Sequence, residues 1–96
     1  MIVIEWSLPA KDDLMTIAEY IAADDPAAAL DVIDRIDSAV GRLADHPGSG
    51  RPGRIAKTRE LVIPDLPYII AYRLRENRVQ ILRVLLHTAR RWPGLA

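Results

Sequence analysis

The second half of the chain carries the side chains that could act on a phosphate group. His87 is the only residue of that half whose ordinary pKa lies near neutrality. Arg59, Arg83 and Arg90 are cations that could hold phosphate oxygens. Metal-free RNA cleavage needs a base for the 2′-hydroxyl, an acid for the leaving 5′-oxygen and positive charge beside the phosphate. If the protein is a ribonuclease, we expect His87, Arg83, Arg59 and Arg90 to form its catalytic site.

The sequence contains no pattern typical of metal or cofactor binding. The chain has no cysteine, and its two histidines cannot by themselves build a structural zinc site. The glycine-rich segment 47–54 does not match the phosphate-binding P-loop pattern. No apolar run approaches the roughly 18 residues of a membrane helix, and the N-terminus does not resemble a signal peptide. We therefore expect a cytoplasmic protein with no cofactor and no metal.

The formal net charge of zero hides a strong asymmetry along the chain. Residues 1–50 contain 3 basic and 10 acidic residues, whereas residues 51–96 contain 10 basic and 3 acidic ones. The two halves could neutralise each other where they pack. Alternatively, the basic half could face phosphate groups or an acidic protein segment.

Local patterns predict one α+β domain over residues 1–96, with the element order β-α-α-β-β-β. β-Branched and aromatic residues favour a strand over 1–6. Two helices are expected over about 9–24 and 26–45, each with a capping residue before it and a proline in its first turn. A loop over 47–54 then precedes three strands, whose alternating patterns cover 58–63, 68–74 and 79–86. The helix hairpin is expected to pack on this small, mainly antiparallel sheet.

Alternation along the last strand predicts which of its side chains are buried. Leu82, Val84 and Leu86 form an uninterrupted apolar set on one face, which favours that face as the core. Arg83 and His87 then lie on the exposed face.

The register of the preceding hairpin stays open at this point. A two-residue turn at Glu76-Asn77 pairs Ile70 with Arg83, whereas a three-residue turn pairs Ala71 with Arg83. Only the second register gathers Arg59, Arg83 and His87 on the same exposed face.

Short motifs run in a specific order and spacing through nearly the whole chain. They are Trp6-Ser7-x-Pro9-Ala10, Asp13-Leu14-x-x-Ile17-x-x-Tyr20-Ile21, Pro26-x-Ala28-Ala29, Leu43-Ala44-x-His46-Pro47-x-x-Gly50-Arg51-x-Gly53-Arg54, Thr58-Arg59-Glu60-Leu61-Val62, Pro67-Tyr68-x-Ile70-x-Tyr72-Arg73, Val79-x-Ile81-Leu82-Arg83-Val84 and His87-x-x-Arg90-x-Trp92-Pro93. Together they resemble the RelE/ParE superfamily, the toxin subunits of type II toxin–antitoxin pairs. The expected element order is also that superfamily's fold.

The resemblance implies a growth inhibitor that a cognate antitoxin neutralises. In the superfamily, a C-terminal segment of a ParD-like or RelB-like antitoxin wraps the toxin. An acidic segment of this kind would suit the basic half of the chain. One branch, resembling ParE, inhibits DNA gyrase. The alternative branch, resembling RelE, cuts messenger RNA on the ribosome without a metal ion.

Three features favour the ParE-like branch. The better-known ribonuclease members have an arginine after the tyrosine of the middle strand, where this chain has Ile69 after Tyr68. Near the C-terminus, Trp92 replaces a second acid–base group, and an indole cannot shuttle a proton. The net charge of zero is also unusual for a protein that binds ribosomal RNA. We therefore expect gyrase inhibition, with mRNA cleavage as the alternative.

Overall fold

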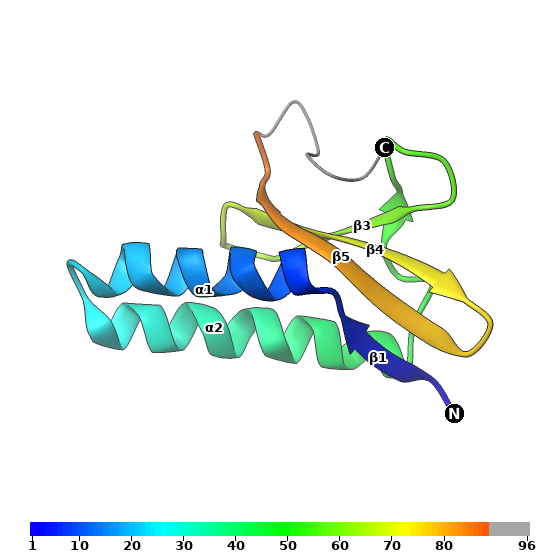
Figure 1. The fold of residues 1–96 in the computed structure, drawn as a ribbon, viewed down its shortest axis with the longest axis horizontal. Helices are drawn as coiled ribbons and strands as arrows, with labels where there is room; N and C mark the ends of the chain where they lie inside the picture. Colours follow the sequence, from blue (N-terminus) through cyan, green and yellow to red (C-terminus); the bar gives the residue numbers. More distant parts are fainter. Residues whose placement is uncertain (89–96) are drawn as a thin grey trace.

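The computed structural model describes residues 1–88, in which two helices pack on a sheet (Figure 1). Its elements are β1 (Val3–Trp6), α1 (Leu8–Ala22), α2 (Pro26–Gly41), a 3₁₀ turn η1 (Arg42–Ala44), β2 (Arg51–Pro52), β3 (Arg59–Val62), β4 (Tyr68–Arg75) and β5 (Arg78–Leu86). The predicted α+β class is confirmed.

Both helices start at the capping residues expected from the sequence. Ser7 Oγ accepts a hydrogen bond from the Ala10 N–H (3.1 Å), and Asp25 Oδ1 accepts one from the Ala28 N–H (3.1 Å). A proline in the first turn of each helix occupies a position whose amide hydrogen is not needed. The predicted helix over 26–45 divides into α2 and the tighter turn η1.

The sheet has the strand order β1-β5-β4-β3-β2. β1 runs parallel to β5, and the other neighbouring strands are antiparallel. β2 lies inside the segment that was expected to be a loop, where Arg51 pairs with Glu60 and Pro52 with Arg59. A strand of two residues, one of them proline, has no alternating pattern for a sequence argument to detect.

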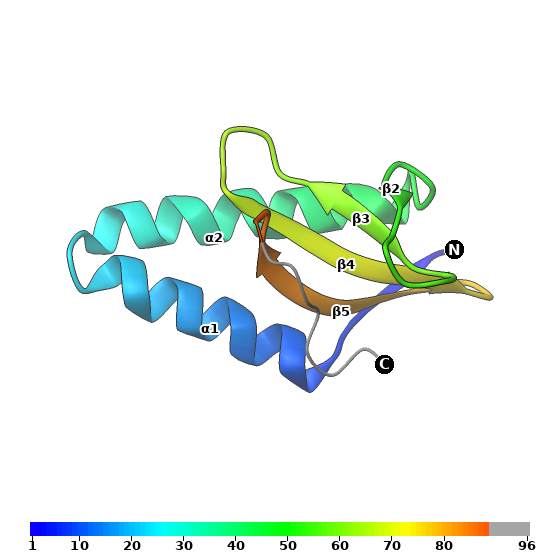
Figure 2. The same ribbon diagram turned by 90° about the horizontal axis from the view of Figure 1, so that it is seen from above.

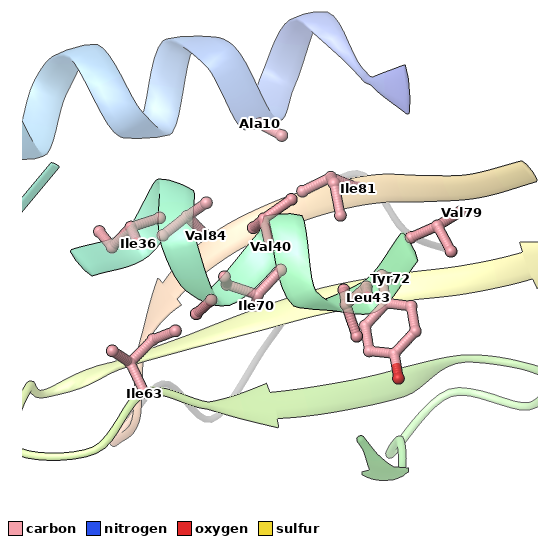
Figure 3. Close-up of a cluster of buried hydrophobic side chains, with 11 residues drawn as sticks. Ala10, Ile36, Val40, Leu43, Ile63, Ile70, Tyr72, Val79, Ile81 and Val84 are labelled. Atoms are coloured by element: carbon pink, nitrogen blue, oxygen red, sulfur yellow. The ribbon is translucent and has the colours of Figure 1, made fainter. Parts of the chain in front are cut away.

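The helices cover one face of the sheet, with α1 beside β5 (Figure 2). The main core lies between the helices and the two central strands (Figure 3). Its buried residues are Ala10, Ile36, Ala39, Val40, Leu43, Ile63, Ile70, Tyr72, Val79, Ile81 and Val84. A smaller cluster on the other face contains Ile69 and Ala71, with Leu82 and Leu85 packed against them.

The β4–β5 hairpin combines features of both registers that the sequence allowed. Its turn has two residues, Glu76-Asn77, because Arg75 pairs with Arg78. The register then shifts between Tyr72, which pairs with Ile81, and Ala71, which pairs with Arg83. Leu82 is therefore the extra residue of a β-bulge in β5.

The bulge overturns the predicted faces of β5. An extra residue reverses the alternation of side chains beyond it. Val79 and Ile81 are fully buried against the helices, although unbroken alternation would put them on the same face as Arg83, which was predicted to be exposed. Leu82 packs on the opposite face and Leu86 is 52% exposed, so the prediction was wrong for both and correct for Val84.

Candidate functional site

Arg83 is held by an internal ion pair, and its predicted exposed position was wrong. Its guanidinium donates two hydrogen bonds of 2.7 Å to the carboxylate of Asp13 in α1. Both side chains are only 16% exposed. The hydrogen bond to Asp13 raises the pKa of Arg83, against the opposing effect of burial. The charge of Arg83 is therefore used to attach α1 to β5.

Asp13 also completes the edge of the sheet. β1 ends opposite Ile81, so β5 continues past its parallel neighbour. Beyond the end of β1, the Val84 N–H donates a hydrogen bond of 3.0 Å to Asp13 Oδ2. The carboxylate takes the place of the backbone carbonyl that a further strand would supply. No local pattern marks Asp13 as the partner of β5, because its partners lie about seventy residues away in the chain.

Arg59 also has a structural role in this molecule. Its Nη1 donates to the carbonyl oxygens of Gly50 (2.8 Å) and Gly48 (3.4 Å). The same loop is held by Tyr72, whose hydroxyl donates to the Pro47 carbonyl (2.8 Å) and accepts from the Gly50 N–H (2.9 Å). These hydrogen bonds hold the loop that precedes β2 against the end of the core.

His87, another of the predicted catalytic residues, lies at the surface. Its backbone N–H donates to the Pro67 carbonyl at 2.7 Å, and its residue is exposed to solvent. Arg90 lies outside the described residues.

The sheet register separates Arg59 from His87. Arg59 pairs with Tyr72, and Tyr72 pairs with Ile81 on β5. His87 follows Ile81 by six residues, which corresponds to roughly 20 Å at about 3.3 Å per residue. Since Arg83 is bonded to Asp13, the structure does not bring these three side chains together around one phosphate position.

A second charged cluster surrounds Glu60, which is only 4% exposed. Arg51 donates to Glu60 Oε1 from Nη2 at 3.0 Å, and the Arg54 backbone N–H donates to Oε2 at 3.0 Å. Burial alone would raise the pKa of Glu60, but the hydrogen bonds from Arg51 and Arg54 and their positive charges outweigh it and lower the pKa. These contacts connect β2 and the loop that follows it to β3.

Glu60 gives the stability of the fold a defined pH dependence. Its folded-state pKa lies below the ordinary value of 4.5, so its stabilising effect is complete above pH 4.5 and is lost as the pH falls through the folded-state pKa. We expect Glu60→Gln to cost about 1–2 kcal/mol at pH 7, because the amide cannot replace the charged hydrogen bonds. Urea unfolding at pH 7 and at about pH 3.5 measures both effects.

Wild type and Glu60→Gln differ only at this residue, so the difference in stability between them at each pH isolates its contribution. The stability gap between the two proteins should narrow toward acid pH. A gap that stays constant would show that Glu60 does not contribute as an ion.

The described surface also has hollows, of which two lie beside loops of the sheet. One, of about 330 Å³, lies between α2 and the loop after β3 and is lined by residues that include Asp34, Ser38 and Ile63. The other, of about 510 Å³, lies beside the loop between β2 and β3, and Lys57, Arg59 and Leu74 contribute to its lining.

Neither a metal-binding site nor a membrane-spanning helix is found among residues 1–88. No group of three or more potential ligands gathers in this part of the chain. None of its helices is both long and apolar enough to cross a bilayer.

Comparison with known proteins identifies the family. Residues 4–92 match the family described as the ParE toxin of the type II toxin–antitoxin system parDE. A relative from Sinorhizobium fredii, named "Putative toxin Y4kP", is 52% identical over 90 residues, which cover 94% of this chain and 92% of the relative. A chain of the solved chromosomal ParDE TA system from P. aeruginosa is 28% identical with a TM-score of 0.80, over 90% of this chain and 96% of that one. This protein therefore belongs to the ParE toxin family of type II toxin–antitoxin systems.

Proposed function

We propose that this protein inhibits bacterial growth by binding DNA gyrase in the cytoplasm. The observation that carries the proposal is that Arg59 and Arg83 form hydrogen bonds within the folded chain. Arg83 is paired with Asp13 and Arg59 with loop carbonyls, while His87 lies far from Arg59 along the sheet. Metal-free RNA cleavage needs such groups gathered on one phosphate. Membership of the ParE family supports the same conclusion.

A type II toxin has a cognate antitoxin as its partner. We propose that an acidic C-terminal segment of this antitoxin covers part of the toxin. The helix hairpin supports apolar contacts with such a partner, because several of its large apolar side chains are more than half exposed. They are Leu8, Met15, Tyr20 and Leu30. A partner segment that buries them would recover their hydrophobic free energy.

The purified chain tests the target directly. Gyrase supercoiling of relaxed plasmid should fall as the toxin is added, and ribosomes that translate a defined message should leave it intact. Induction of the chain in a bacterium should give filaments, stalled replication and an SOS response. Cut messages together with normal supercoiling would instead establish the alternative, ribosome-dependent mRNA cleavage.

His87→Gln separates the two mechanisms at one residue. We expect the variant to inhibit gyrase within about twofold of wild type, because replacing one exposed side chain changes a free energy by less than about 0.5 kcal/mol. A ribonuclease that uses His87 as its acid or base would lose its activity.

The His87 test requires a folded variant. Its thermal unfolding should match wild type, since the hydrogen bond to Pro67 comes from the backbone and not from the imidazole. A folded His87→Gln protein that no longer arrests growth would contradict the gyrase proposal.

A further inference from the structure

The charges of the molecule are separated between its two ends. Figure 1 shows the α1–α2 connection at one end and the β4–β5 turn at the other. The connection and the helix that follows it are rich in carboxylates, namely Asp24, Asp25, Asp31, Asp34 and Asp37. Cations gather at the other end on the β4–β5 hairpin, in the neighbouring β2–β3 loop and at the start of β3. They are Lys57, Arg59, Arg73, Arg75 and Arg78. We call this second group the hairpin-end basic surface.

The sheet register and the hollow beside the loop place these cations at the same end of the sheet, on both of its faces. Arg75 and Arg78 share the face of Ala71, whereas Arg59 shares the opposite face with its cross-strand partner Tyr72. Arg75 and Arg78 are cross-strand partners, and Arg73 precedes Arg75 by two residues on β4. Lys57 and Arg59 line the 510 Å³ hollow together with Leu74 of β4. Like charges directly opposite each other destabilise a sheet, so the fold itself gains nothing from the pairing of Arg75 with Arg78.

Little negative charge opposes this surface. Arg78 is the only one of the five that forms an ion pair within residues 1–88, and its partner is Glu5 on the exposed edge. Arg73 donates to the neutral amide of Gln80 and Arg59 to backbone carbonyls. The turn adds one more carboxylate, Glu76. Five cations and two carboxylates leave an excess of positive charge at this end.

Lys57 also occupies a costly backbone conformation. Its φ of 66° lies in the left-handed region, which glycine and asparagine adopt more readily than lysine. Lys57 forms no ion pair in the described part of the chain that would explain its presence. An unfavourable residue at a charged hollow points to a role in binding.

We propose that the hairpin-end basic surface binds the phosphate backbone of duplex DNA. This inference rests on the proposed function for its setting, in which the DNA is the segment held by gyrase. Phosphate contacts from lysine and arginine supply most of non-specific DNA affinity. A two-stranded β-ribbon also fits the major groove of B-form DNA, whereas the major groove of A-form RNA is too deep and narrow.

An acidic protein segment is the less suitable partner. Protein interfaces rely on apolar anchors at their centre. The lining of the hollow includes one large apolar side chain, that of Leu74, which is 43% exposed. A phosphate backbone needs no such anchor, and this surface offers mainly charge.

Fluorescence anisotropy of a labelled 20-base-pair duplex with the purified chain tests the proposal without gyrase. We expect binding that weakens steeply with salt. Lys57→Gln and Arg75→Gln should each weaken it about three- to tenfold and lower the slope of log K against log salt by about one. Lys57→Gly should weaken DNA binding equally while its melting temperature stays the same or rises, which a merely structural lysine would not do.

Lys11→Gln is the matched control, because it removes one exposed positive charge from α1, away from the proposed surface. It should leave DNA affinity within about twofold of wild type. Equal losses of DNA affinity for Lys11→Gln and Arg75→Gln would show that binding depends only on the net charge of the protein and not on this surface. Failure to bind the duplex at low salt, tighter binding of a poly-glutamate peptide, or equal binding of duplex RNA would each overturn the proposal.

The outcomes also distinguish this inference from the proposed function. If wild type binds DNA and the surface variants do not, but gyrase is never inhibited, the surface is correct and the target is wrong. If gyrase is inhibited equally by wild type and by Arg75→Gln, gyrase is the target and the DNA contact is not part of its inhibition.

Discussion

Asp13→Ala is expected to lower the free energy of unfolding by about 3 kcal/mol, and the melting temperature by roughly 12 °C or more. The substitution leaves the largely buried guanidinium of Arg83 without its carboxylate and removes the acceptor of the Val84 N–H. Removing one member of a buried pair costs more than the pair contributes, because the remaining charge is still shielded from water. Urea unfolding followed by circular dichroism measures the loss.

Arg35→Ala is the control for this experiment. It breaks the pair between Arg35 and Asp31 on the surface of α2, whose side chains are 49% and 61% exposed. An exposed pair of this spacing contributes only about 0.3–0.5 kcal/mol. If Asp13→Ala costs no more than Arg35→Ala, the Asp13–Arg83 pair does not stabilise the fold.

A double-mutant cycle then isolates the coupling between the two groups. Asp13→Ala with Arg83→Ala should cost clearly less than the sum of the single changes, because no unpaired charge remains. Additive effects would show that Asp13 acts mainly through Val84.

Gly50→Ala is expected to destabilise the fold by about 2–3 kcal/mol, since it overfills a closed site. A Cβ at this position would lie 2.6 Å from Tyr72 Oη, 2.7 Å from Tyr72 Cε1 and 3.0 Å from the Glu60 carbonyl oxygen. Tyr72 is fully buried and hydrogen-bonded to both Gly50 and Pro47, so its ring cannot move aside freely. Thermal and urea unfolding of the variant measure the cost.

Gly48→Ala adds the same methyl group two residues earlier in the same loop. Nothing lies within 4 Å of the added Cβ there, so we expect a change of less than about 0.5 kcal/mol. A Gly50→Ala protein as stable as Gly48→Ala would mean that the loop is not closely packed on Tyr72.

The two helices and the order of the longer strands followed from the sequence alone, whereas the two-residue strand β2 did not. Each helix start depends on contacts three residues apart, between Ser7 and Ala10 and between Asp25 and Ala28, and such contacts are visible as local patterns. The alternating pattern of the last three strands is local in the same way. The motifs that resemble the toxin superfamily predicted the family that the comparisons show.

The positions of the charged side chains depended on the tertiary structure. Alternation along a strand assumes an unbroken ladder, and the bulge at Leu82 reversed the faces that alternation predicted for β5. The hairpin register was undecided for the same reason, because the two-residue turn and the pairing of Ala71 with Arg83 are compatible only through that bulge.

The partner of each arginine was equally inaccessible to local reasoning. In the sequence, Asp13 is one of several acidic residues that suit the start of a helix. Folding brings it against Arg83, seventy residues away, and so converts a candidate phosphate ligand into part of the scaffold. Arg75 has the same side chain but lies at the hairpin end, opposite another arginine. Whether an arginine serves the fold or a partner is decided by which groups the packed chain brings within hydrogen-bonding distance of it, and those groups are distant in the sequence.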